Sequence, residues 1–220
     1  MASILKDRER IHADKLVAQF SSVGSLGKTE DQWLRGEFAE ALASSSADLE
    51  LIYPSVEDVR NSFEGYGAGR SLCYLYGTHQ KQLYLKKYLR RWRAGKSGRT
   101  RAAPHMKSYG GTDDQQSFVW FLMTSANLSK AAWGCFEKSQ TQFFIRSYEL
   151  GVLFVPSKIG DQRLKQALTD VIPYDTPCPK YGNEDEPWIW DIPYAEFFEP
   201  WIWDIPYAEK DALGNTYMAD

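Results

Sequence analysis

The alternation of hydrophobic and polar residues predicts a chain in which β-strands and helices are mixed. Five runs have the length and the β-branched or aromatic content of strands, at residues 16–20, 49–53, 104–109, 118–124 and 142–155. The last run is long enough to bend or split. A helix is expected over residues 30–43, with Thr29 as its cap, and a short helix is expected where Ser55 and Asp58 form a capping box. This mixture indicates an α/β fold.

The middle of the chain has a different pattern. The glycines and aromatics of residues 65–77 indicate a loop. Residues 80–93 carry leucine and tyrosine at helical spacing, with cations at the other positions, which predicts a basic amphipathic helix. Residues 94–103 are rich in glycine, serine and arginine and predict a mobile loop.

Charge is segregated along the sequence although the net charge is only −3. Residues 65–112 contain 11 of the 26 cations and no acid, so the remainder holds 15 cations against 29 acids. Such a segment, with residues 86–101 at its centre, is expected to give one face a nonspecific positive field that attracts a polyanion.

Size and composition exclude several classes of protein. At 220 residues and 43% hydrophobic content the chain can bury a core, so it is not a disordered segment. The charged start and the absence of a run of about 18 apolar residues predict an intracellular, soluble protein rather than a membrane protein. The three cysteines are widely spaced and are expected to be buried thiols rather than zinc or redox ligands.

Three side chains carry candidate chemistry. His105 and Lys107 stand two residues apart on a predicted strand, which would place them on one face. The strand at 118–123 leads into Thr-Ser-Ala-Asn, so Asn127 is delivered at a strand end. An ammonium, a carboxamide and an imidazole suit a phosphate, because they neutralise its charge, donate to its oxygens and attack phosphorus or move a proton. No carboxylate cluster with metal spacing accompanies them, so we expect a reaction without a metal or other cofactor.

Glu149 is a fourth candidate. It lies within the apolar run of residues 147–155, where a lone carboxylate is costly unless it is paired. His105 is the expected partner. Such a pair would fix the tautomer of the imidazole and raise its pKa.

Each of these residues also has an ordinary structural interpretation. His105 alone is more often a structural histidine, Asn127 a helix cap, and Glu149 a partner of Arg146. A second His-x-Lys at residues 79–81 has no Ser-x-Asn after it and is interpreted as a solvated helix end. The joint spacing of the four candidates favours function.

The motifs resemble a known family. His-x-Lys followed by Ser-x-Asn is similar to the phospholipase D superfamily, and residues 120–134 and 145–154 resemble the eukaryotic tyrosyl-DNA phosphodiesterases. Residues 20–27, 51–57 and 187–194 resemble the same family. Lipid-cleaving members carry Asp five residues after the Lys, where this chain has Thr112. Residues 1–15 are a charged segment by their composition. For residues 16–220 the resemblance implies a phospholipase-D-like mixed sheet flanked by helices, one of two pseudo-symmetric halves.

The resemblance also implies a reaction. The family hydrolyses the bond between a topoisomerase tyrosine and a DNA 3′-phosphate through a phosphohistidine, as part of DNA repair in the nucleus. The nucleophilic histidine would belong to a first cluster in an N-terminal half that these residues do not include. His105 matches the general acid and base, Lys107 and Asn127 the phosphate-binding pair, and Glu149 the carboxylate that supports the histidine.

Substrate contacts are implied by the same matches. The residues matching DNA contacts are Ser21, Ser22, Ser25, Ser71, Ser129 and Lys130. Residues 21–25 are equally expected as simple turn residues. Trp190 matches an aromatic residue on the peptide side, and Trp203 competes with it because residues 187–196 recur letter for letter as residues 200–209. Only one copy can occupy the original place.

The expected partner is a single- or double-stranded DNA 3′ end bearing a topoisomerase-derived tyrosyl peptide, together with the N-terminal half. Two alternatives stay open at this point. One is a catalytically inactive fragment or isoform that only binds DNA ends. The other is a homodimeric phospholipase-D-like nuclease or lipase with one cluster per subunit.

Overall fold

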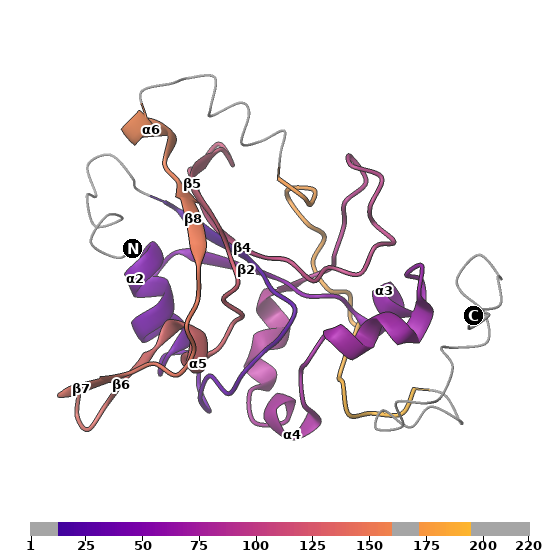
Figure 1. Cartoon of the computed structure of the whole chain (residues 1–220), viewed down its shortest axis with the longest axis horizontal. Coiled ribbons are helices and arrows are strands. Elements are labelled where there is room, and N and C mark those ends of the chain that lie inside the picture. Colours follow the sequence, from indigo (N-terminus) through magenta and orange to yellow (C-terminus); the bar gives the residue numbers. More distant parts are fainter. Residues whose placement is uncertain (1–12, 160–171, 195–220) are drawn as a thin grey trace.

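A six-stranded mixed sheet forms the centre of the computed structural model, which describes residues 13–159 and 172–194 (Figure 1). The strand order is β3-β2-β1-β4-β5-β8; β1, β2 and β3 are parallel, and β4, β5 and β8 pair antiparallel. The strands are β1 (Lys15–Gln19), β2 (Asp48–Ile52), β3 (Leu89–Arg90), β4 (Lys107–Thr112), β5 (Phe118–Thr124) and β8 (Gly151–Phe154). The predicted α/β class and the strands at 16–20, 49–53 and 118–124 are confirmed.

Helices in the described residues are short. They are a π-helical segment (Leu34–Ala39), α2 (Glu40–Leu42), α3 (Val56–Arg60), a 3₁₀ helix (Gly65–Ser71), α4 (Tyr76–His79), a second 3₁₀ helix (Leu83–Tyr88), α5 (Lys130–Trp133) and α6 (Pro156–Ile159). The capping box of α3 is confirmed: Ser55 Oγ accepts from Asp58 N and Asp58 Oδ2 accepts from Ser55 N, both at 3.1 Å. Thr29 is not a cap, because the first helix begins only at Leu34 and its N-cap is Trp33.

The predicted basic helix over residues 80–93 is wrong. Gln82 is buried and ties this segment to the core, because its Oε1 accepts from Leu26 N at 2.9 Å and its Nε2 donates to Gly24 O at 3.1 Å. A 3₁₀ turn and the strand β3 follow it. Pairing of β3 with β2 outweighs the local helical spacing.

The positive face predicted for residues 86–101 is also wrong over residues 86–93. Acids distant in sequence fold against these cations, and the ion pairs are Lys86–Glu186, Lys87–Glu30, Arg90–Glu50, Arg91–Asp58 and Arg93–Asp58. Most of the local charge is therefore neutralised within the fold.

The glycine-rich run at residues 65–77 is a loop only in part, because Gly65–Ser71 form a 3₁₀ helix, residues 72–75 are not helical and α4 begins at Tyr76. Trp188 packs directly over Gly69, where an added Cβ would lie 2.0 Å from Trp188 Cζ2, and Trp188 Nε1 donates to Gly69 O at 3.0 Å. The absence of a side chain at Gly69 thus makes room for a buried indole. Residues 94–103, predicted as a loop, form turns.

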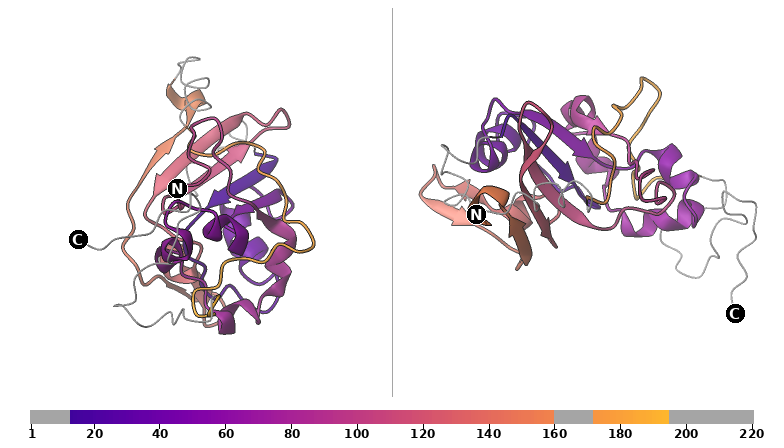
Figure 2. Two further views of the ribbon diagram at one scale, coloured as in Figure 1. Left: turned by 90° about the vertical axis from the view of Figure 1, so that its right-hand side faces the viewer. Right: turned by 90° about the horizontal axis from the view of Figure 1, so that it is seen from above.

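Hydrophobic side chains cover both faces of the sheet. Alternation along β1 sends Leu16 and Ala18 into the larger core and Val17 into a smaller core on the other face, where Ile52 and Phe121 join it. The larger core is closed by the π-helical segment, α3 and the first copy of the repeated decapeptide. The predicted split of residues 142–155 is confirmed, since β7 (Gln142–Phe144) pairs with β6 (Cys135–Glu137) and β8 returns to the main sheet. The β6–β7 hairpin projects at the end of the molecule opposite to α3 (Figures 1 and 2).

The described part of the repeat is residues 187–194, which belong to the first copy. Its Trp188 is 1% exposed and stacks on Tyr194, with ring centroids 4.5 Å apart. The second copy at 200–209, with Trp203, lies outside the described residues, as do residues 1–12. The first copy therefore occupies the packed place.

Candidate active site

The chain segments that carry the predicted phosphate-binding residues lie at one end of the strands. Gln19, at the end of β1, pairs with Ser108 near the start of β4, and Lys107 pairs with Thr124 at the end of β5. Because these neighbours are antiparallel, the residues after β1, before β4 and after β5 converge there. The sequence thus brings the segments of Ser21, Lys107 and Asn127 together.

Asn127 is held by a turn that directly follows β1. Its Oδ1 accepts from Ser21 N at 3.1 Å, Ser22 N at 2.9 Å and Ser21 Oγ at 3.2 Å. A backbone N–H can only donate, so the atom at the centre of these contacts is the carboxamide oxygen. Within the described residues no acceptor takes the Asn127 Nδ2 hydrogens. The half-buried carboxamide therefore keeps two donors for a ligand.

His105 lies outside the strand on which it was predicted. β4 begins at Lys107, so the prediction of a shared strand face is wrong; His105 is exposed, and Lys107 Nζ donates to His105 O at 2.5 Å. Partial burial lowers the pKa of His105, and the Lys107 ammonium lowers it further. Partial burial also lowers the pKa of Lys107, while Glu149 opposes that shift.

Glu149 is exposed, although it lies within an apolar run of the sequence. Its Oε2 accepts from Ser125 Oγ at 2.5 Å, and the same Oγ accepts from Leu150 N at 3.0 Å. Among the residues that the structure describes, no hydrogen bond joins Glu149 to His105. The sequence pointed to Ser125 only as part of Ser-x-Asn, and its contact with Glu149 was missed.

The three serines after β1 differ in exposure. Ser21 is buried at 1% exposure, Ser22 is half-buried and Ser25 is exposed. Cys73 lies beside this turn, because Cys73 N donates to Ser21 O and Val23 N donates to Cys73 O, both at 3.0 Å. Cys73 is exposed, which contradicts the expectation of a buried thiol; Cys135 and Cys178 are buried as expected.

Ser129 and Ser71 make local structural contacts. Ser129 is the N-cap of α5, its Oγ accepting from Ala132 N at 3.2 Å, and Ser71 Oγ donates to Ala68 O at 3.0 Å. Gly24 lies against the first of them, since an added Cβ would come within 2.7 Å of Ser129 Cβ. Lys130, next in the chain, is half-buried.

Trp190 extends the same group of segments. Its backbone N donates to Tyr74 O at 2.9 Å and its Nε1 donates to Arg70 O at 3.2 Å. Hydrogen bonds therefore join four segments side by side, in the order 127–130, 21–25, 70–74 and 188–190. We name this arrangement the four-segment surface. The described residues that were predicted to contact DNA or peptide lie on these four segments.

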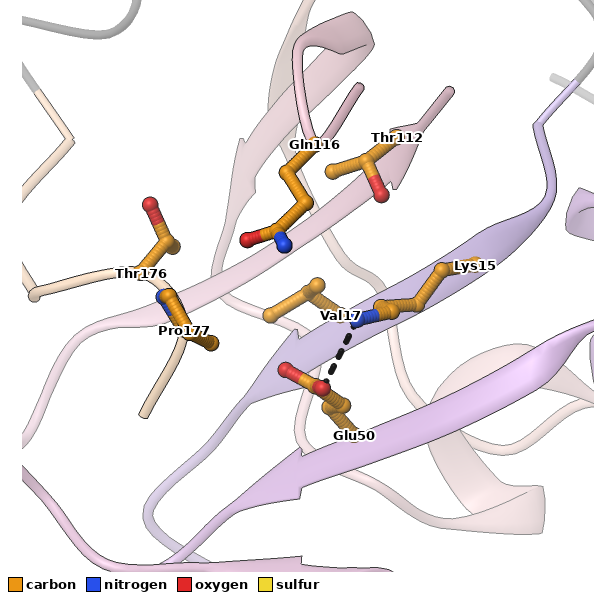
Figure 3. A pocket seen from close by; sticks show the side chains of 7 residues that line it. All are labelled: Lys15, Val17, Glu50, Thr112, Gln116, Thr176 and Pro177. Carbon is orange, nitrogen blue, oxygen red and sulfur yellow. Dashed lines mark hydrogen bonds and ion pairs between the residues drawn. The ribbon is translucent and has the colours of Figure 1, made fainter. Parts of the chain in front are cut away.

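A small pocket lies at the other end of the strands (Figure 3). Its polar walls include Lys15 at the start of β1 and Thr112 at the end of β4, and Lys15 Nζ lies 2.9 Å from Glu50 Oε1. None of the predicted site residues lines it. Within residues 13–159 and 172–194, no three His, Cys, Asp or Glu side chains form a group that could hold a metal ion, and no helix is long and apolar enough to cross a membrane.

Known proteins resemble this chain in sequence. Residues 1–186 match the family model described as tyrosyl-DNA phosphodiesterase. Tyrosyl-DNA phosphodiesterase 1 of Arabidopsis thaliana is 38% identical over 86% of this chain and 38% of its own length. A probable tyrosyl-DNA phosphodiesterase of Caenorhabditis elegans is 41% identical over 80% of this chain and 39% of its own length. The chain thus spans under half the length of these relatives.

A solved structure shares the fold. The yeast tyrosyl-DNA phosphodiesterase superposes with a TM-score of 0.63 at 21% identity, over 86% of this chain and 52% of that chain. The mixed sheet flanked by helices is accordingly phospholipase-D-like, as the motifs implied. Because residues 1–186 match the family model, the chain belongs to the tyrosyl-DNA phosphodiesterase family.

Proposed function

We propose that this chain supplies the second His-Lys-Asn cluster of a DNA-repair phosphodiesterase that hydrolyses 3′-phosphotyrosyl bonds. The observation that carries the proposal is the fixed carboxamide of Asn127, which holds two N–H donors three residues beyond Thr124, the β5 residue that pairs with Lys107. Donors that are already oriented, on a segment that leads away from the Lys107 pair, suit a phosphate whose negative charge grows during displacement.

His105 has the acid and base role in this proposal. A histidine of the first cluster attacks phosphorus, the P–O bond to tyrosine breaks, and His105 gives its proton to the leaving oxygen. Water then attacks phosphorus, His105 takes the proton of that water, and the P–N bond breaks to release a 3′-phosphate. The pKa of His105 is lowered in this chain alone. A bound phosphate anion would raise it, which favours the protonated form needed in the first step.

Large apolar side chains are exposed next to the cluster. They are Met123, Phe136, Phe143, Phe144, Ile145, Tyr148, Leu150 and Val152, on or between the edge strand β8, the β6–β7 hairpin and β5. Met123 pairs with Val152 and Phe136 pairs with Phe143, so these side chains gather on neighbouring strands, and exposed apolar side chains that gather in this way usually mark an interface. We propose that a second phospholipase-D-like half, carrying the first cluster, covers this surface and completes the site.

The four-segment surface is the proposed path of the DNA and peptide. Ser22, Ser25 and Lys130 keep accessible polar groups along it, as phosphate contacts require. Trp190 lies at its far end, which suits the peptide side of the bond. The substrate is then a DNA 3′ end bearing a topoisomerase-derived tyrosyl peptide, the location is the nucleus, and the reaction uses no metal.

A turnover assay on a 3′-phosphotyrosyl oligonucleotide tests this function. We expect no turnover by the chain alone, and turnover when the N-terminal half of the Arabidopsis relative is supplied as a separate polypeptide. Binding of DNA without turnover in both cases would favour the inactive DNA-binding alternative. Robust turnover by the chain alone would contradict the half-enzyme proposal. If the rate per chain then rose with chain concentration as a dimer forms, the homodimeric alternative would be favoured.

A further inference from the structure

The Ser21 side chain points into the protein rather than toward a ligand. It is 1% exposed, and its hydroxyl donates to Asn127 Oδ1 at 3.2 Å. Its backbone carbonyl accepts from Cys73 N at 3.0 Å. A hydroxyl this buried cannot reach a DNA phosphate, so the DNA contact implied for Ser21 by resemblance does not fit its position.

The orientation of a carboxamide decides what Asn127 can bind. Rotation by 180° exchanges the oxygen and the NH₂ group with little change in shape, yet only the NH₂ group can donate to a phosphate oxygen. In the rotated state, Nδ2 would face the N–H groups of Ser21 and Ser22 and leave them without an acceptor. Partly buried N–H groups without an acceptor cost free energy, so the observed orientation of the Asn127 carboxamide is strongly preferred.

We propose that Ser21 is a positioning residue for Asn127, and that it acts through Asn127 instead of touching DNA. Its N–H and hydroxyl supply two of the three donors that hold Oδ1, and this leaves Nδ2 to bind a non-bridging phosphate oxygen. The identity of that ligand rests on the proposed function. The Ser21–Asn127 geometry does not.

The turn is held from both sides, as a positioning element should be. On one side Gly24 N donates to Leu128 O at 2.9 Å, which fixes the turn against the chain beyond Asn127. On the other side Cys73 pairs with Ser22 as an isolated parallel bridge. The donors therefore meet Asn127 with a geometry set by the backbone.

Binding of two matched oligonucleotides tests the proposal on the full chain. One oligonucleotide ends in a 3′-phosphate and the other in a 3′-hydroxyl. The Kd of the 3′-hydroxyl oligonucleotide divided by that of the 3′-phosphate oligonucleotide then measures how much the terminal phosphate contributes to binding. Ser21→Ala removes the hydroxyl donor and should reduce this ratio about fivefold, the factor for one neutral hydrogen bond. In an Asn127→Ala background Ser21→Ala should have no further effect, because the two residues act as one unit.

A direct DNA contact by Ser21 gives a different result. Ser21→Ala would then weaken binding of both oligonucleotides, and the loss would persist in the Asn127→Ala background. That outcome would overturn the proposal. Ser62→Ala is the matched control, since Ser62 is also a buried serine and its hydroxyl donates to Gly65 O at 3.2 Å, away from the site. It should leave the ratio unchanged.

Amide hydrogen exchange tests the geometry without any ligand. The Ser21 and Ser22 amides should exchange slowly in the wild-type chain and about tenfold faster or more in Asn127→Ala. Equal exchange in the two proteins would overturn the positioning role. Protected amides combined with no preference for a 3′-phosphate would instead contradict the proposed function and support the Ser21–Asn127 geometry.

Discussion

At the scale of single residues, each candidate is defined by its contacts. The Glu149 carboxylate is joined to Ser125, and the His105 imidazole lies near the Lys107 ammonium. The pKa of the histidine in this chain is thus governed by partial burial and a neighbouring cation. A pairing of His105 with Glu149 would have had the opposite effect on that pKa.

We therefore expect an NMR titration of the chain to give His105 a pKa below its usual 6.5. Lys107→Met should raise this pKa, because it removes the neighbouring ammonium, and Glu149→Gln should leave it unchanged. His79 is the internal control, because its pKa is lowered by partial burial and neither Lys107 nor Glu149 contributes to that shift. A His105 pKa above 6.5 that falls in Glu149→Gln would show that the two side chains pair.

Residue types and spacing indicated the candidate residues but not the contacts that these residues make. Ser-x-Asn predicted a carboxamide at a strand end, and Asn127 lies three residues beyond Thr124, which ends β5 and pairs with Lys107. The partner of Asn127 was not predictable, because Ser21 is 106 positions away and reaches it only through the β1–β4–β5 pairing. Glu149 was misjudged because an apolar run can lie on an open surface as well as in a core.

At the scale of elements, predictions from local sequence patterns are confirmed where the pairing of the strands does not oppose them. The strand at 118–124 and the capping box of α3 follow from short-range rules and are present. The prediction of a basic helix was wrong because β3 pairs with β2, and Arg91 and Arg93, which follow β3, form ion pairs with Asp58 on α3. Ion pairs between distant elements thus fix the middle of the chain.

Asp58 should accordingly be important for stability. Burial alone would raise its pKa, but hydrogen bonds from Arg91, Arg93 and Ser55 N outweigh burial, so the pKa lies below 3.8. The ionised carboxylate then stabilises the fold above about pH 3.8, and this contribution is lost as the pH falls through the folded-state pKa. In urea unfolding at pH 7, Asp58→Asn should lower the free energy of unfolding by about 3 kcal/mol.

The difference between Asp58→Asn and wild type should narrow as the pH drops below 3.8. Glu57→Gln is the control on the same helix. Its ion pair with Arg60 is exposed, so the variant should change the free energy of unfolding by less than about 1 kcal/mol. Equal effects of the two variants would show that the Asp58 network does not stabilise the fold.

At the scale of the whole molecule, the repeated decapeptide closes the larger core. The first copy inserts Trp188 over Gly69 and stacks it with Tyr66 and Tyr194. The two copies have identical residues, so sequence alone could not decide which one packs. The structure places the first copy there.

Trp188→Ala should therefore lower the free energy of unfolding by about 3–5 kcal/mol, the usual cost of removing a buried tryptophan. The matched change in the other copy, Trp203→Ala, should lower it by less than Trp188→Ala does, because Trp188 fills the place over Gly69. Chemical denaturation of both variants measures this. A small loss in Trp188→Ala alone, with a large loss in the double variant, would mean that the second copy can take the same place.

The central claim is that this chain provides the acid and base side of the reaction, and the location of the covalent DNA adduct tests it most directly. The chain and the N-terminal half of the Arabidopsis relative, supplied as separate polypeptides of different size, would be mixed with 3′-phosphotyrosyl DNA labelled at its 5′ end. We expect labelled adduct on the N-terminal half, and we expect His105→Ala to slow its resolution at least about 100-fold. Label on the present chain, or resolution at the wild-type rate in His105→Ala, would contradict the claim.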